Sequence, residues 1–264
     1  MDNRPIGVFD SGIGGLTVVD ALSKSLPNET IYYVGDTARV PYGNKSKIRI
    51  QQYALEIANW LNKKDCKIII VACNTASALA LKYLSSIFSI PIIGVIEPGV
   101  IRGIQMNQNN KVAVLGTSAT IRSNEYGKRI KSAKPETSVI SQACPLFVPL
   151  AEEGWVEGKV PIQIAANYLA NIKKVGVDTV ILGCTHYPLL KKTISTILGG
   201  EVNLVDSGEA VVKKVISTLE KIKGFSSSQN GKIKCYVTDD PSLFNNVASR
   251  FCLKKTEQAI QIDL

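Results

Sequence analysis

Residues 68–75 read Ile-Ile-Ile-Val-Ala-Cys-Asn-Thr, and residues 180–186 read Val-Ile-Leu-Gly-Cys-Thr-His. Each stretch runs from an apolar segment into a cysteine beside small polar residues, as expected where a buried parallel strand ends. The two cysteines, Cys73 and Cys184, lie 111 residues apart, too far for one local motif. They predict equivalent positions in two halves of a duplicated architecture. Two thiols that face one pocket could take and return the same proton.

Further β-branched segments alternate with segments of helical spacing along the chain. The expected strands are Ile6–Asp10, Ile31–Gly35, Ile68–Ala72, Ile92–Ile96, Val112–Leu115, Val180–Leu182 and Val202–Val205. The expected helices are Leu16–Leu26, Lys47–Lys64, Ala76–Leu84, Leu189–Leu198 and Glu209–Lys223. This alternation is typical of an α/β fold with parallel sheets.

The two halves correspond beyond the cysteines. The matched segments are 8–12 with 114–118, and 93–96 with 204–207. We therefore expect two pseudo-symmetric parallel-sheet α/β domains, residues 1–96 plus 209–264 and residues 97–208. The active site is expected in the cleft between them, where the strands of both sheets end. The segment from about Glu209 onward has no counterpart in the second half and is expected to pack on the first.

The composition indicates an ordinary globular protein. The chain has 264 residues, of which 45% are hydrophobic and 20% charged, enough for a sizeable core. No signal-peptide pattern opens the sequence, and its apolar runs are far shorter than the ~18 residues of a membrane span. We therefore expect a cytoplasmic protein without a membrane partner. The six cysteines are scattered without a C-x-x-C pair, which argues against disulfides and against a metal site.

A formal charge of +9 raises the question of a nucleic-acid partner. The lysines recur in pairs in or near the expected helices, which favours solvated outer faces. Only residues 122–134 are locally dense in basic side chains. The charge pattern therefore argues against nucleic-acid binding, while a basic patch that attracts an acidic partner or substrate stays open.

Two loops after expected strands could line a site. Residues 10–15, Asp-Ser-Gly-Ile-Gly-Gly, would leave backbone amides free at a helix start, which suits an anion. Thr17 stands where the third glycine of a dinucleotide-binding loop would be, so that cofactor is poorly supported. Residues 35–43, Gly-Asp-Thr-Ala-Arg-Val-Pro-Tyr-Gly, combine turn residues with charged and aromatic side chains.

A cysteine base needs a partner, because a thiol with a pKa near ~8.5 is only a few per cent ionised at neutral pH. His186 is the only histidine of the chain and lies two residues after Cys184. Asp10 ends a strand expected beside that of Cys73. Each thiol therefore has a candidate acid/base partner.

These motifs together resemble the glutamate racemases of the aspartate/glutamate racemase superfamily, in the right order from about residue 6 to 210. The segments that carry the resemblance are 10–16, 35–43, 72–77, 94–99, 144–150, 183–190 and 205–208. The resemblance implies cofactor-independent racemisation of glutamate, with D-glutamate supplied for peptidoglycan, and a homodimer. It is thinner after Lys223.

The resemblance also implies roles for single residues. Cys73 and Cys184 would be the two acid/base residues, with Cys73 deprotonating the D-isomer and Cys184 the L-isomer. Asp10, Glu152 and His186 would assist them. The implied substrate-binding residues are Asp10, Ser11, Tyr42, Gly43, Asn74, Thr75, Thr185 and His186, with Thr117 as a weaker candidate.

Three other functions stay open at this point. An aspartate racemase would share both thiols and differ only in substrate. A two-lobed binding module would bind a small molecule without turnover. A thiol hydrolase would use Cys184 and His186 but would leave Cys73 without a role.

Overall fold

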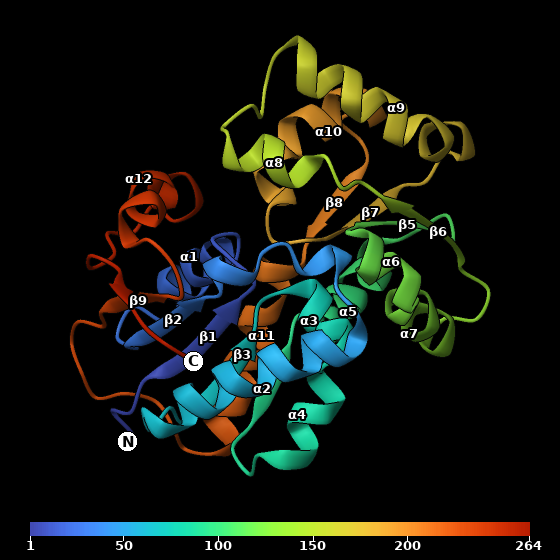
Figure 1. Cartoon of the computed structure of the whole chain (residues 1–264). Coiled ribbons are helices and arrows are strands. Elements are labelled where there is room, and N and C mark those ends of the chain that lie inside the picture. The colour runs from blue at the N-terminus through green and yellow to red at the C-terminus, as the bar shows by residue number, and fades with distance from the viewer.

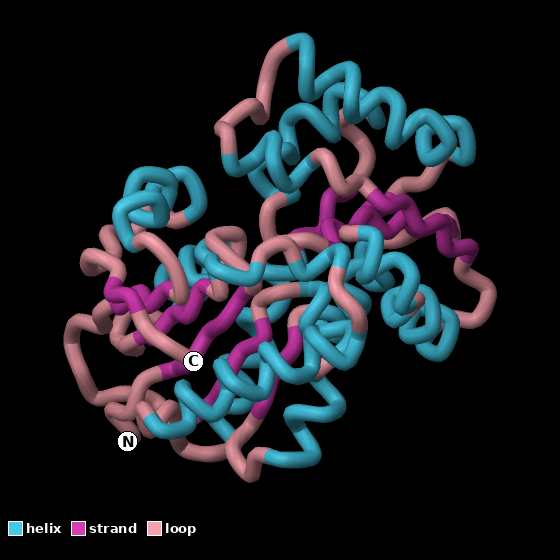
Figure 2. Tube along the Cα trace, in the orientation of Figure 1, coloured by secondary structure: helices cyan, strands magenta, loops and turns pink.

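The computed structural model describes all 264 residues, and its strands form two separate parallel sheets flanked by helices (Figures 1 and 2). The six-stranded sheet has the order β10 (Ile260–Gln261), β9 (Ile233–Val237), β2 (Ile31–Gly35), β1 (Ile6–Asp10), β3 (Ile68–Val71) and β4 (Ile92–Gly94). The four-stranded sheet has the order β6 (Ser138–Ala143), β5 (Lys111–Gly116), β7 (Thr179–Gly183) and β8 (Asn203–Asp206). The order β2-β1-β3-β4 matches β6-β5-β7-β8, so the predicted pseudo-symmetric α/β architecture is confirmed.

Twelve α-helices surround the sheets. They are α1 (Leu16–Ser25), α2 (Lys47–Lys63), α3 (Asn74–Leu79), α4 (Leu81–Ile87), α5 (Ile96–Met106), α6 (Ser118–Ser123), α7 (Glu125–Ala133), α8 (Phe147–Glu152), α9 (Lys159–Val175), α10 (Lys191–Leu198), α11 (Ser207–Lys221) and α12 (Pro241–Phe251). Three short 3₁₀ helices cover Thr37–Arg39, Tyr42–Asn44 and Tyr187–Leu190. None of the helices is long and apolar enough to cross a membrane.

The apolar side chains of the strands pack into cores on both faces of each sheet. In β3, Ile68 and Ile70 belong to one core, whereas Ile69 and Val71 belong to the core on the opposite face. Successive side chains of a strand point to opposite faces, so an unbroken apolar run is what a strand covered on both sides requires. The same alternation in β7 fills the two cores of the smaller sheet.

The strand register brings the two predicted partners on the first sheet together. β1 lies next to β3, with Phe9 opposite Val71, and the amide of Ala72 donates to the carbonyl of Phe9 at 2.9 Å. Asp10 and Cys73 therefore emerge side by side from the carboxyl ends of neighbouring strands, as the sequence predicted.

Several expected elements begin or end one or two residues away from the expected bounds, and two were wrong in a way that has a clear cause. The strand expected over Ile92–Ile96 ends at Gly94, because the Val95 amide donates to the Ser77 hydroxyl at 3.2 Å and Val95 already has helical φ and ψ. Ile96 instead begins α5. The helix expected over Ala76–Leu84 is two helices, separated at Ala80 with φ −121°.

The C-terminal segment packs back onto the first sheet as expected. β9 pairs with β2 in parallel, and α11 packs against both α1 and α5. Figure 1 shows α12, in red, beside α1, in blue, and the two helices are in contact. The first sheet and its helices are thus built from both ends of the chain.

Candidate active site

The two predicted thiols line one small cavity. Cys73 caps α3, and Cys184 follows directly after β7; their exposed fractions are 5% and 6%. The cavity has a volume of about 30 Å³, room for only one or two water molecules. Its lining residues are Ser11, Pro41, Tyr42, Gly43, Cys73, Asn74, Thr75, Thr117, Val148, Cys184, Thr185 and His186. Among the predicted site residues, only Asp10 and Glu152 lie behind this wall rather than in it.

A buried carboxylate supports the Cys73 side. Asp10 is fully buried, and its Oδ2 accepts the Gly15 amide at 2.9 Å, while its Oδ1 is buried without a hydrogen-bond partner. Burial raises the pKa of Asp10, although the electrostatic effect of the nearby His186 and hydrogen bonds from backbone amides oppose the rise. Burial, followed by the charge of Asp10, raises the pKa of Cys73 to about 12. A carboxylate oxygen with free acceptor capacity therefore lies close to a thiol that holds its proton firmly.

A histidine and a carboxylate in series support the Cys184 side. His186 Nδ1 lies 3.9 Å from Cys184 Sγ, and His186 Nε2 lies 2.9 Å from Glu152 Oε1. The imidazole is buried, whereas 42% of the Glu152 side chain is exposed. Burial raises the pKa of Cys184 well above its usual range, partly opposed by the His186 backbone amide. Burial favours the protonated Cys184 thiol. The His186 imidazole, oriented by the Glu152 carboxylate, can accept the proton of that thiol.

The glycine-rich loop brings the two lobes together at this site. A Cβ on Gly14 would lie 2.4 Å from Thr185 Oγ1 and 2.5 Å from His186 Nδ1, so only glycine fits there. The Gly15 amide, a candidate anion donor by sequence, is already bonded to Asp10. The glycines therefore permit close approach of the loop after β1 to the loop after β7.

Hydroxyl and amide groups form the polar wall of the cavity. The hydroxyl of Thr75 lies 2.9 Å from that of Thr117 and 3.2 Å from that of Thr120. Tyr126, almost fully buried, donates its hydroxyl to Asn74 Oδ1 at 2.6 Å. In both cases a residue of α3 meets partners from the other sheet's helices, so the wall is shared between the two lobes.

The predicted Tyr42–Gly43 turn is held from behind by a buried carboxylate. Asp36 is fully buried, accepts hydrogen bonds from the Tyr42 hydroxyl and from Thr238 Oγ1, and is paired with Arg39. The Tyr42 hydroxyl is thus already bonded within the protein. The proton of this hydroxyl is therefore not available to a substrate carboxylate, whereas the ring and the backbone of the turn face the cavity.

Sequence reasoning missed several contributors to the site. Pro41 and Val148 line the cavity, and both stand inside motifs that had been singled out. Thr120 and Tyr126 act from behind the wall; Tyr126 lies in the segment 122–134, noted only for its basic charge, and Thr120 lies just before that segment. Their hydroxyls matter through contacts between lobes, for which the local sequence gives no signal.

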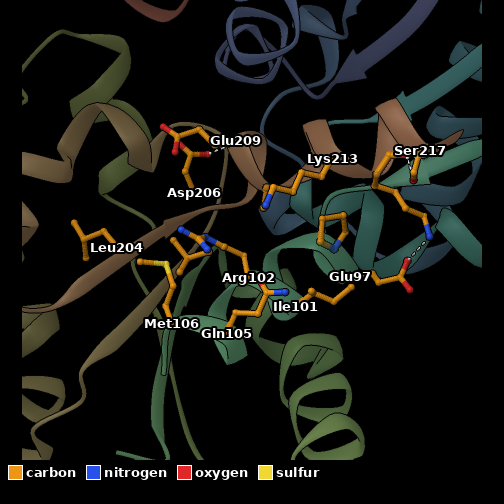
Figure 3. A pocket seen from close by; sticks show the side chains of 14 residues that line it. Glu97, Ile101, Arg102, Gln105, Met106, Leu204, Asp206, Glu209, Lys213 and Ser217 are labelled. Atoms are coloured by element: carbon orange, nitrogen blue, oxygen red, sulfur yellow. Dashed lines mark hydrogen bonds and ion pairs between the residues drawn. The ribbon is translucent and has the colours of Figure 1, made fainter. Parts of the chain in front are cut away.

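A wider groove lies elsewhere on the molecule. It has a volume of about 490 Å³ and is lined by side chains of α5, α11 and the end of β8, including Glu97, Arg102 and Lys213 (Figure 3). It contains no thiol and none of the predicted site residues. This groove is much larger than the small cavity, but the acid/base groups converge on the small cavity.

Comparison with known proteins agrees with this geometry. The family model for Asp/Glu/hydantoin racemases matches residues 7–215. The chain belongs to this racemase family. A curated glutamate racemase of Geobacter metallireducens is 48% identical, with 99% of this chain and 97% of the relative covered. The predicted resemblance, and with it the expectation of an amino-acid racemase, is confirmed.

Solved structures of the family share the whole fold. A glutamate racemase isoform of Bacillus anthracis superposes with a TM-score of 0.96 at 36% identity, covering 100% of this chain and 99% of the other. The glutamate racemase of Francisella tularensis, solved in complex with D-glutamate, gives a TM-score of 0.93 at 42% identity, covering 100% and 98%. The similarity therefore includes α12, which lies beyond the residues matched by the family model.

Proposed function

We propose that this chain interconverts L- and D-glutamate without a cofactor, using Cys73 and Cys184 as the two acid/base residues. The observation that carries the proposal is the pair of buried thiols on one cavity, each beside its own partner, Asp10 or His186. The D-glutamate bound by the relative from Francisella tularensis supports glutamate as the substrate.

Racemisation requires a proton to leave one face of the α-carbon and another to arrive at the opposite face. For L-glutamate, the Cys184 thiolate takes the α-proton, and the electron pair of the broken C–H bond passes into the α-carboxylate. The Cys73 thiol then gives its proton to the other face, and the C–H bond of D-glutamate forms. For D-glutamate the two thiols exchange roles, as microscopic reversibility requires. Asp10 is the acid/base partner of the Cys73 thiol. His186, held by Glu152, is the acid/base partner of the Cys184 thiol.

The intermediate needs stabilisation because no cofactor ring spreads its charge. We assign this task to preorganised donors around the cavity, which act strongly where water is excluded. The proposed donors are Ser11, the backbone at Tyr42 and Gly43, and the side chains of Asn74, Thr75 and Thr185, with Thr117 beside them.

A cavity of about 30 Å³ is too small for glutamate, so the lobes must separate to admit it. We propose that they move as residues 1–96 plus 209–264 and residues 97–208. Helices α5 and α11, which pack together near both boundaries, would accommodate the motion.

We also propose the cellular setting that the resemblance implies: a cytoplasmic homodimer that supplies D-glutamate for peptidoglycan. Light scattering after gel filtration tests the homodimer. Loss of viability on depletion of the protein, restored by D-glutamate in the medium, tests the supply role.

The first experiment is incubation of the purified protein with L-glutamate in deuterated water, followed by polarimetry and by the α-proton NMR signal. Loss of rotation together with deuterium uptake at the α-carbon is expected. Activity on aspartate instead would support the aspartate racemase alternative. Thermal stabilisation by glutamate without either change would overturn the proposal in favour of a binding module.

A further inference from the structure

The last helix of the chain reaches the acid/base groups of the opposite lobe. Helix α12 follows β9 of the six-stranded sheet, and its Phe244 and Phe251 lie in the core beneath that sheet. Just past the helix, the Leu253 amide donates to Asp20 of α1 at 2.9 Å. The end of α12 is thus fixed to the first lobe.

Two consecutive residues at this end contact the His186–Glu152 pair. The Phe251 ring is 4% exposed and meets the His186 imidazole edge-on, with ring centroids 5.4 Å apart at 81°. Arg250 Nη1 donates to the backbone carbonyl of Glu152 at 2.5 Å. Phe251 therefore contacts the imidazole of His186. Arg250 holds the backbone of Glu152, whose carboxylate is hydrogen-bonded to that imidazole.

The turn after Glu152 is shaped around the Arg250 guanidinium. Gly154 has a φ of +76°, and a Cβ there would lie only 3.3 Å from Arg250 Cζ and Nη1. Because 42% of the Glu152 side chain is exposed, packing around that side chain holds it only in part. The backbone contact from α12 supplies a constraint that the Glu152 side chain lacks.

We propose that Arg250 and Phe251 are positioning residues that hold His186 and Glu152 against Cys184, so that α12 completes the proton-transfer site of the other lobe. The inference rests on the proposed two-thiol function. It concerns residues outside the span matched by the family model, which ends at residue 215. Neither side chain lines the cavity, so both act only through His186 and Glu152.

The test is the kinetic isotope effect of α-deuterated glutamate. Enantiomers have equal free energies, so kcat/KM must fall equally in both directions for any variant. The α-deuteron of L-glutamate is removed at Cys184, whereas that of D-glutamate is removed at Cys73. A slower Cys184 step therefore raises the isotope effect on kcat/KM for deuterated L-glutamate and lowers it for deuterated D-glutamate.

Phe251→Leu keeps an apolar side chain but removes the ring that contacts His186. We expect kcat/KM to fall about tenfold, since small misplacements of catalytic groups are costly, with the isotope effects moving apart as described. Phe244→Leu is the matched control on the same helix: Phe244 is 3% exposed and its ring stacks on Tyr33 rather than on His186. It should reduce stability comparably and leave both isotope effects unchanged.

Arg250→Ala carries the test if Phe251→Leu fails to fold, because Arg250 lies on the surface. Arg250→Lys, which can still donate to the carbonyl, should restore part of the rate. Since His186 is the only histidine, its ¹⁵N imidazole signals are uniquely assignable without any turnover. Arg250→Ala should shift them toward those of Glu152→Gln.

Two results would overturn the proposal: unchanged isotope effects in Phe251→Leu, or unmoved imidazole signals in Arg250→Ala. Failure of the proposed function has a different signature. The unmodified protein would then show no exchange at the α-carbon, while the imidazole signals would still report whether α12 positions the pair.

Discussion

Replacing Tyr126 by phenylalanine should show whether its hydroxyl aligns the cavity wall for catalysis or only stabilises the fold. Tyr126 belongs to α7, and its hydroxyl donates to Asn74 Oδ1 at 2.6 Å. Asn74 follows Cys73 directly and lines the cavity. The other contact of the Asn74 amide is with Ser207 Oγ, at 3.4 Å from both Oδ1 and Nδ2. The short hydrogen bond from Tyr126 is thus the contact that fixes which end of the Asn74 side-chain amide carries the oxygen.

The expected size of the effect follows from this geometry. Tyr126→Phe removes one hydroxyl and leaves Asn74 Oδ1 with only the long contact to Ser207. An unsatisfied buried acceptor costs about 1–3 kcal/mol. If the amide keeps its orientation, this cost appears as a loss of stability, roughly 2–4 °C in Tm per kcal/mol for a chain of this size. If it rotates to find a partner, the wall is misaligned and kcat/KM falls, about tenfold for 1.4 kcal/mol.

The assay measures kcat/KM for glutamate and the free energy of unfolding in urea for the same preparations. Tyr187→Phe is the matched control, because Tyr187 is fully buried and donates its hydroxyl at 2.8 Å to the carbonyl of Cys144, which does not line the cavity. We expect Tyr187→Phe to lose stability with little loss of kcat/KM, whereas in Tyr126→Phe the freed amide rotates and the cost appears mainly as a loss of kcat/KM. Equal kinetic losses in both variants, or none in Tyr126→Phe with full stability, would refute the reasoning.

Three further outcomes follow from the site and its burial. Cys73→Ala and Cys184→Ala should each abolish racemisation, measured by polarimetry, with unchanged circular dichroism; substantial activity in either would contradict the two-thiol scheme. Gly14→Ala should reduce kcat/KM by about 10²-fold, because its Cβ would lie 2.4 Å from Thr185 and force the lobes apart; normal kinetics would show that the loops need not approach so closely. Stability should fall above pH 9, because burial raises the pKa of both Cys73 and Cys235 from 9.0 to about 12, so the unfolded chain releases these protons first. Each such thiol lowers the free energy of unfolding by up to about 1.4 kcal/mol per pH unit between pH 9 and 12, and a flat urea midpoint from pH 8 to pH 10 would argue against this.

The parts of the site that sequence could predict are those that lie at strand ends. Parallel strands buried on both faces leave an unbroken apolar run, and the residue after the run must lie at the carboxyl edge of the sheet. Cys73 and Cys184 are found there, and β1 pairs with β3, so Asp10 lies beside Cys73. These placements need only that the strand before Asp10 is a neighbour of the strand before Cys73, as expected from the sequence.

Weakly patterned elements escaped prediction for identifiable reasons. Strand β6 reads Ser-Val-Ile-Ser-Gln-Ala and lies at the edge of its sheet, where its side chains are only partly buried. Helix α5 begins Ile-Glu-Pro-Gly, and its proline and glycine conceal a helix start behind an apolar strand sequence. Partial burial at a sheet edge weakens the alternation that predicts a strand, and an apolar segment that continues from a strand into a helix hides the point where the helix begins.

The contact between α12 and His186 could not be read from any local pattern, because it depends on a succession of long-range pairings. β9 must first pair with β2, which places α12 against α1, and only then does Phe251 reach the imidazole. The family model ends at residue 215, whereas the fold of the relatives extends through this segment. A contact that depends on the whole fold can therefore lie outside the span that the family model matches, and α12 can still take a direct part in aligning the Cys184 side of the site.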